Sequence, residues 1–147
     1  MNLAGEEASK AFKLGEVPVG CLIVDKDRRV IASAHNLKET NKFSCHHAEI
    51  LAIEKASQAL GAWRLLGCTA FVTLEPCPMC LSAFLQSRIE SLVFGAYDPK
   101  GGAISLGYNF AKDSRLNHSF QVIGGVSHYE HSKTMSDFFR QRRKGYK

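Results

Sequence analysis

The chain has 147 residues, a length that suits one compact domain with one hydrophobic core. Hydrophobic residues make up 45% and charged residues 22% of the chain, which excludes a disordered protein, and no apolar run approaches the roughly 20 residues that span a bilayer. The first residues show neither the basic nor the apolar segment of a secretory signal, so we expect a cytoplasmic protein without membrane contact.

The net charge of +5 is concentrated near the C-terminus. Residues 1–139 carry 14 basic and 14 acidic side chains, whereas the last eight residues contain no acid and five bases: Arg140, Arg142, Arg143, Lys144 and Lys147. A cationic segment suits the C-terminal end of a helix, and it equally suits binding to the phosphates of a nucleic acid. Charge alone does not choose between these two roles.

The first half of the chain predicts a helix, a hairpin and a second helix. Helical spacing of alanines predicts a helix over residues 3–14, with Gly15 as its stop. Apolar and β-branched residues predict strands over 17–24 and 30–34, followed by an irregular polar segment over 35–46. From His47 onwards an apolar stripe predicts a second helix whose buried face holds Ile50, Ile53, Ala56, Leu60 and Trp63.

The second half predicts further strands that alternate with helices. Strands are expected over 69–74, 91–95 and 120–123. A helix with Pro76 in its first turn is expected after the first of these strands, and a glycine-rich loop is expected over 98–106. A last helix begins with Ser132 as its N-cap and has a face made of Met135, Phe138 and Phe139. This alternation predicts an α/β fold around a central sheet.

Two short motifs at the starts of predicted helices carry metal-binding chemistry. Pro76-Cys77-Pro78-Met79-Cys80 places two thiolates one helical turn apart, close enough to bind one ion. His47 adds an imidazole, and a mixed thiolate and imidazole set predicts zinc. Three protein ligands leave the fourth tetrahedral position to water, which is the arrangement of a catalytic zinc.

Glu49 follows His47 by two residues and is the candidate catalytic acid and base. Residues two apart on a helix point about 200° away from each other, so His47 is expected at the non-helical cap, where both side chains reach the metal. Zinc lowers the pKa of bound water to about 7, and Glu49 would carry the protons of the reaction. The combination H-x-E…P-C-x-x-C is the signature of zinc-dependent base deaminases, in which the glutamate is not a ligand.

Cys45 and His46 offer an alternative, because either could be a fourth ligand that closes a structural zinc site. Only His47, however, stands in the H-x-E register, and a closed site would leave Glu49 without a role. We therefore expect Cys45 and His46 to be solvated loop residues. Five cysteines, an odd number, also fit poorly with a disulfide framework.

Over nearly its whole length the chain resembles the bacterial tRNA-specific adenosine deaminases. The matching segments outside the zinc motifs are Gly15-Glu16-Val17-Pro18-Val19-Gly20, His35-Asn36, Trp63-Arg64-Leu65, Ser87-Arg88-Ile89, Val93-Phe94-Gly95-Ala96, Asp98-Pro99-Lys100-Gly101-Gly102, Leu116-Asn117-His118 and Phe138-Phe139-Arg140. The resemblance implies one deaminase domain over residues 1–147, folded as a cytidine-deaminase-like three-layer α/β/α sandwich with a central five-stranded mixed sheet.

The resemblance also implies the reaction and its partners. It implies a homodimer with one zinc ion per subunit that converts adenosine to inosine at the wobble position of an arginine tRNA, held by its anticodon stem-loop. The residues it places at the substrate are Asn36, Ala48, Asp98, Lys100, Phe138, Phe139 and Arg140.

Two departures from the family pattern keep other functions open. Phe43-Ser44-Cys45-His46 stands where the family usually has Asp-Pro-Thr-Ala, and Pro78 resembles the guanine deaminases. One alternative is therefore a deaminase of free guanine or of a cytosine nucleoside or nucleotide. A second alternative is a zinc-stabilised RNA-binding module, which would give Glu49 no task.

Overall fold

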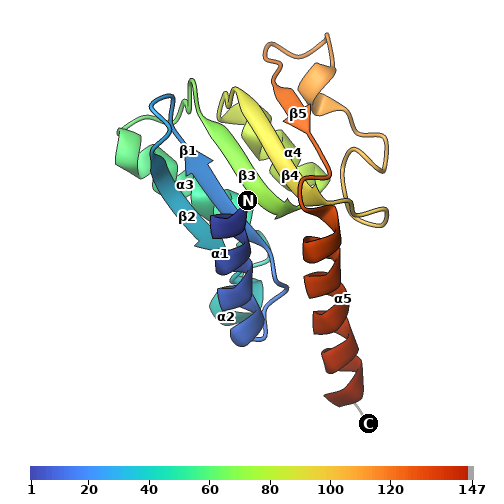
Figure 1. Ribbon diagram of the computed structural model, residues 1–147. Helices are drawn as coiled ribbons and strands as arrows, with labels where there is room; N and C mark the ends of the chain where they lie inside the picture. Colours follow the sequence, from blue (N-terminus) through green and yellow to red (C-terminus); the bar gives the residue numbers. More distant parts are fainter. Residues whose placement is uncertain (146–147) are drawn as a thin grey trace.

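The computed structural model describes residues 1–145, and it contains a five-stranded sheet with the strand order β2-β1-β3-β4-β5 (Figure 1). The strands are β1 (Gly20–Val24), β2 (Val30–His35), β3 (Thr69–Leu74), β4 (Ser91–Ala96) and β5 (Gln121–Ile123). β1 is antiparallel to both β2 and β3, whereas β3, β4 and β5 run parallel. The predicted mixed sheet of five strands is confirmed.

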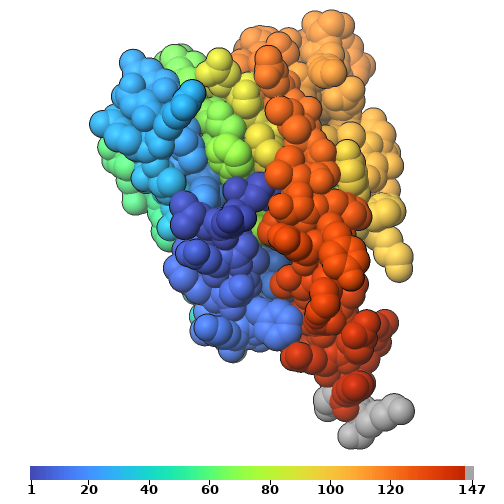
Figure 2. Space-filling view, viewed as in Figure 1, coloured from blue at the N-terminus to red at the C-terminus, as the bar shows by residue number. Residues whose placement is uncertain are grey.

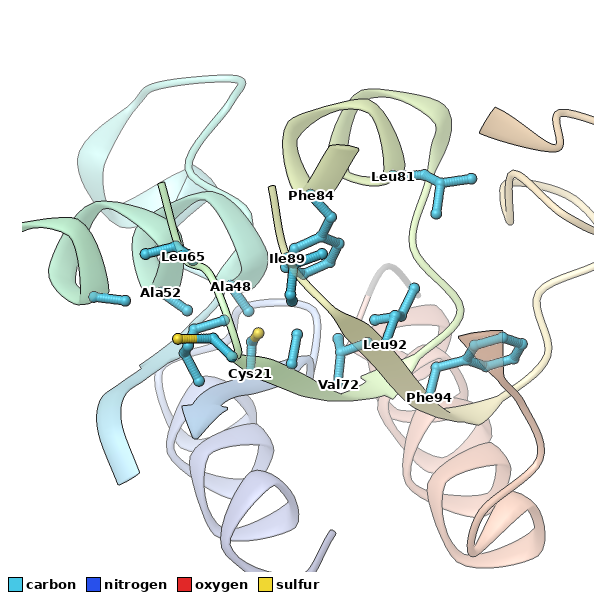
Figure 3. Packing of buried hydrophobic residues seen from close by; sticks show 14 of the residues in the cluster. Cys21, Ala48, Ala52, Leu65, Val72, Leu81, Phe84, Ile89, Leu92 and Phe94 are labelled. Carbon is cyan, nitrogen blue, oxygen red and sulfur yellow. The ribbon is translucent and has the colours of Figure 1, made fainter. Parts of the chain in front are cut away.

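Helices cover both faces of this sheet, as the three-layer prediction requires (Figures 1 and 3). α1 (Asn2–Lys13) and α5 (His128–Gly145) lie on one face, and α3 (Ala48–Leu60) and α4 (Pro78–Gln86) lie on the other. α1 and α5 pack side by side, as Figure 2 shows, with the rings of Phe12 and Phe138 in edge contact. A short α2 (Lys38–Asn41) and a 3₁₀ turn η1 (Phe110–Lys112) complete the elements. Within residues 1–145 no helix combines the length and the apolar character needed to cross a membrane.

The buried face of α3 differs from the predicted stripe. Ala48, Ala52 and Ala56 are fully buried, and their small side chains let the helix backbone approach the sheet closely. Figure 3 shows Ala48 and Ala52 on the side of α3 that faces the sheet. Leu60 and Trp63 are 42% and 54% exposed, because the helix ends at Leu60 and Gly61 follows in the left-handed conformation. Ala56 of the predicted stripe is buried as expected, and Ile53 is partly buried against the core. Ala48 and Ala52, which the predicted stripe did not include, are the other small residues that fit between this helix and the sheet.

Close approach also explains Gly20, the first residue of β1. A Cβ atom there would lie 2.1 Å from the carbonyl oxygen of Ala4 in α1, so only glycine fits beneath that helix. β1 begins at Gly20, three residues after the start of the strand predicted over 17–24. Pro18 has no N–H for a ladder hydrogen bond, and the chain turns at Val19, whose N–H donates to the carbonyl of Val17.

Several helix boundaries also differ from the predictions. α4 begins at Pro78 with Cys77 as its N-cap, so Pro78 and not Pro76 occupies the first turn. α5 begins at His128, before Ser132, and the His128 ring anchors its start by accepting a hydrogen bond from the Tyr97 N–H. Of the basic residues near the C-terminus, Lys147 lies outside the described residues.

Candidate active site

The candidate site lies at one edge of the sheet, where four strand ends meet. The carboxyl ends of the parallel strands β3 and β4 reach this edge together. Because β1 runs antiparallel to both β2 and β3, its amino end and the carboxyl end of β2 lie at the same edge. α3 and α4 begin here, directed by His47 and Cys77 as their N-caps. In open α/β sheets, the crevice beyond the carboxyl ends of the strands is the usual ligand site.

Three metal-ligating side chains meet at this edge: His47, Cys77 and Cys80. The Nδ1 atom of His47 lies 3.7 Å from the Cys77 sulfur and 3.6 Å from the Cys80 sulfur. Ligands of a tetrahedral zinc ion, with bonds of about 2.0–2.3 Å, lie about 3.6 Å apart. The side chains therefore stand at the spacing that zinc requires, and the chemistry of one imidazole and two thiols also fits zinc.

The charge distribution of the three ligands also favours a cation. Hydrogen bonds from Cys80 and then from His47 lower the pKa of Cys77 to about 4, although burial opposes this. The thiolate of Cys77, together with burial, raises the pKa of Cys80. The same thiolate raises the pKa of His47. Because metal ligands must be deprotonated, a metal ion that binds here would displace the protons of these side chains.

Glu49 stands directly beside this cluster. His47 has extended backbone angles (φ −72°, ψ 154°), so it is the non-helical cap that the sequence predicted, and Glu49 belongs to the first turn of α3. Glu49 is only 4% exposed, and burial, reinforced by the charge of Cys77, raises its pKa to about 7. A carboxyl group with this pKa can both accept and donate a proton near neutral pH.

Cys45 and His46 do not join the cluster. Among residues 1–145, the group of potential metal ligands contains His47, Cys77 and Cys80 alone. The His46 ring instead lies 2.9 Å from the side-chain nitrogen of Asn41 and packs on Phe43, and the Cys45 sulfur contacts the Ser44 hydroxyl. The site therefore offers three ligands, which leaves the fourth position of a tetrahedral metal open.

A small pocket of about 190 Å³ opens onto His47, Glu49 and Cys77. Its remaining wall comes from both sides of the edge and consists of Val17, Val19, Asn36, Lys38, Leu74, Glu75, Asp98 and Gly101. This volume is below the range of pockets for drug-sized ligands, so it suits one ring system rather than a whole nucleotide. Asn36 and Asp98, two of the residues implied by the family resemblance, thus line the same pocket as His47, Glu49 and Cys77.

A wider groove of about 820 Å³ continues from this pocket towards α5, and both share Val17, Leu74 and Asp98. The groove combines basic side chains, which are Lys100, Arg140 and Arg143, with the apolar surfaces of Tyr97, Met135 and Phe139. Three more of the implied substrate residues, Lys100, Phe139 and Arg140, therefore lie together. Arg143 also lies here, although the sequence identified it only as part of a charged segment.

Two implied substrate residues lie apart from these hollows. Phe138 is 3% exposed and packs against Phe12 of α1, so it belongs to the core, while Phe139 is 43% exposed in the groove. Ala48 is fully buried between His47 and Glu49. Another hollow, of about 850 Å³ around Leu22 and Phe71, contains none of the three potential metal ligands.

Two buried carboxylates that the sequence did not single out hold the walls of the pocket. Glu75 accepts hydrogen bonds from the backbone N–H groups of Asp98 and Ser105 and from the Ser105 hydroxyl, at 2.6–2.9 Å. Glu16 holds the opposite wall through Asn36 and the segment that follows it. One signal in the sequence could have identified them, because each is a carboxylate directly next to an apolar run. Glu75 follows Val72-Thr73-Leu74, and Glu16 precedes Val17-Pro18-Val19.

Comparison with known proteins gives a consistent result. Residues 1–143 match the profile of the MafB19-like deaminases. A relative from Bacillus subtilis, named tRNA-specific adenosine deaminase, is 49% identical over 98% of this chain and 89% of its own length. A relative of the same name from Haemophilus influenzae is 45% identical over 97% of this chain and 83% of its own length. A solved structure from studies of A-to-I editing by tRNA:A34 deaminases superposes with a TM-score of 0.86, at 41% identity over 91% of this chain and 96% of that one.

Proposed function

This chain belongs to the family of tRNA-specific adenosine deaminases, and from this premise we propose that it converts adenosine to inosine at the wobble position of an arginine tRNA. The observation that carries the proposal is the position of Glu49, a buried carboxyl group beside a three-ligand metal cluster at the end of a base-sized pocket.

His47, Cys77 and Cys80 would hold one zinc ion per chain. When bound there, zinc would make a hydroxide nucleophile available at neutral pH, because it lowers the pKa of a water molecule to about 7. The two ligand segments are held firmly: His47 caps α3, and Cys77 caps α4, whose first turn contains Cys80. The Leu51 and Leu81 N–H groups donate to the carbonyls of these two caps, which fixes the backbone of both.

Glu49 moves the protons. It accepts a proton from the water that attacks C6 of adenine and delivers that proton to N1. It then takes a second proton from the hydroxyl added at C6, which becomes the carbonyl of inosine, and passes it to the amino group, which leaves as ammonia. One carboxyl group can serve these steps because the ring nitrogen needs a proton at the moment when the water loses one. The raised pKa of Glu49, near 7 owing to burial, fits a group that must take up and release protons in turn.

The pocket and the groove divide the recognition of RNA between them. The target base must be unpaired to reach the metal, and loops of RNA present such bases. Asn36 and Asp98 lie at the base, while Lys100, Arg140 and Arg143 neutralise the phosphates of the loop. Phe139 offers an exposed ring for stacking, and Phe138 supports it from the core, because their rings are in edge contact.

The family resemblance also supports a homodimer and a place in the cytoplasm, where the tRNA substrate is found. Light scattering at micromolar concentration tests the dimer. A mass of twice 16.2 kDa is expected, and a monomer mass contradicts this part of the proposal.

The reaction is tested by incubating the protein with an arginine-tRNA anticodon stem-loop and measuring inosine by mass spectrometry of the digested RNA. Free guanine, cytidine and deoxycytidylate are run in parallel. Inosine in the RNA supports the proposal. If the RNA is unchanged and only guanine, cytidine or deoxycytidylate is deaminated, the protein is instead a deaminase of a free base, nucleoside or nucleotide. Pro78 does not favour guanine, because proline is preferred at the first position of a helix for backbone reasons alone.

A further inference from the structure

The buried carboxylate of Glu16 contacts Asn36, a residue that lines the substrate pocket. Its side chain is fully buried and accepts three hydrogen bonds. The Asn36 side-chain nitrogen donates at 3.1 Å and the Glu39 N–H at 3.2 Å to one oxygen, and the Thr40 N–H donates at 2.6 Å to the other. The hydrogen bonds from Thr40 and Glu39, with the charge of Arg142, outweigh burial and lower the pKa of Glu16, so it is ionised.

An ionised carboxylate only accepts hydrogen bonds, so it can face only the nitrogen of the Asn36 amide. This determines which way the amide is turned, a choice that the shape of the side chain leaves open. The backbone of Asn36 is held as well, because its N–H donates to the carbonyl of Val19. The asparagine therefore has one orientation within the pocket wall.

The amide oxygen of Asn36 is left free by this arrangement. Among residues 1–145 it accepts no hydrogen bond from the protein, and it is not wholly buried, since His131 Nε2 is the one wholly buried side-chain polar atom without a partner there. Asn36 lines the pocket beside His47 and Glu49. A substrate in the pocket thus meets an acceptor oxygen at this point.

We propose that Glu16 is a positioning residue that orients the Asn36 amide, so that the pocket presents a hydrogen-bond acceptor and selects a nucleoside that offers an N–H or O–H donor there. This inference rests on the proposed function, because it assumes that the pocket receives the target nucleoside. Glu16 itself does not line the pocket and acts through Asn36.

The test uses two substitutions that exchange amide and carboxylate. Glu16→Gln gives the Asn36 amide a partner that can donate, so the amide can turn over and present its nitrogen to the substrate. Asn36→Asp places two carboxylates against each other, which is unfavourable. In the double variant the new carboxylate accepts a hydrogen bond from the new glutamine amide and again presents an acceptor oxygen. Glu7→Gln is the matched control, because Glu7 is also a buried carboxylate but pairs with Lys10 and His35 outside the pocket.

We expect each single substitution to lower kcat/KM for the stem-loop RNA at least about tenfold, the effect of one mispaired buried polar group. The double variant should recover to within about threefold of the original protein, with zinc content unchanged throughout, and Glu7→Gln should stay near the original value. A role of Glu16 in stability alone predicts no such recovery. An unaffected Glu16→Gln protein, or a double variant no better than Glu16→Gln, overturns the inference.

A second measurement does not depend on activity. In the NMR spectrum of the original protein, the Asn36 side-chain NH₂ should exchange slowly with solvent because it donates to a buried carboxylate. Glu16→Gln should shift these signals and speed their exchange, and unchanged signals overturn the inference. If the original protein makes no inosine in RNA, the proposed function fails, while the NMR comparison still decides the orientation of Asn36.

Discussion

The Nδ1 atom of His47 lies 3.6 Å from the sulfur of Cys80, although 33 positions separate them in the chain. α3 carries the chain away from the site, and β3 brings it back to the same edge of the sheet, where α4 begins. Two helix starts thus meet at one point, and the positive ends of their dipoles stabilise thiolates there.

One zinc ion per chain should be bound tightly, and Cys77→Ala or Cys80→Ala should lose it, because two remaining ligands cannot hold the ion. Metal content is measured by plasma mass spectrometry after dialysis. Cys45→Ala is the control and should retain its zinc, since Cys45 lies outside the ligand cluster. Full retention of zinc by Cys77→Ala, or four protein ligands in X-ray absorption, contradicts the assigned site.

Glu49→Gln should keep zinc and RNA binding but lose at least the roughly 10²–10⁴-fold that general acid–base catalysis contributes, because an amide cannot accept and return a proton. Metal content and a gel shift with the stem-loop RNA are measured first, so that misfolding is excluded. The rate of inosine formation by the variant is then compared with that of the original protein. A zinc-loaded, RNA-binding Glu49→Gln protein that works at nearly the original rate shows that another group moves the protons.

Replacing Arg142, Arg143 and Lys144 together by Ala should weaken RNA binding and flatten its dependence on salt. Arg143 lines the groove, and each lost phosphate contact reduces the slope of log K against log salt by about 0.7 for single-stranded RNA. Turnover at saturating RNA should barely change. A control triple variant at Lys26, Arg28 and Arg64 removes the same charge outside the pocket and groove. Equal salt slopes for both variants would mean that the end of α5 is only a solvated helix terminus.

Acidification should destabilise the protein through His131. This ring is 8% exposed and packs against Gly5 and Gly95, and its Nε2 atom is the wholly buried polar side-chain atom without a partner in residues 1–145. Burial lowers its pKa below the ordinary value of 6.5, and the attraction of Glu130 opposes this only in part. The unfolded chain then binds more protons than the folded one as the pH falls below about 6.5, so stability decreases there.

Urea unfolding between pH 5 and pH 8, compared between the original protein and His131→Leu, measures this effect. Leucine cannot titrate, so the variant should lose less stability on acidification than the original protein does. The comparison removes the contributions of all other groups that titrate in both proteins. An identical pH dependence would mean that the folded state tolerates the charged imidazole, for example by opening the start of α5.

The sequence by itself determined the class of fold, the group of three potential metal ligands and the carboxyl group that we propose as the catalytic acid and base. The strands at 69–74 and 91–96 were predicted almost to the residue, because runs of β-branched and apolar residues between turn residues indicate buried strands. His47 as a cap followed from the geometry of a helix, since two residues on one turn cannot otherwise reach the same ion. Strand positions and helix caps depend on residues that are close together in the chain, so the spacing of residue types in the sequence predicts them.

Only the tertiary structure decided which residues surround the pocket. Glu16 and Glu75 read as ordinary charged residues, and they become the supports of two walls because segments far apart in the chain place their N–H groups around them. Phe138 and Phe139 are neighbours in the chain, but Phe138 is in the core because it packs against Phe12 of α1, whereas Phe139 lines the groove. Hydrogen bonding and burial of this kind depend on contacts between distant segments, and a single sequence carries no local signal for those contacts.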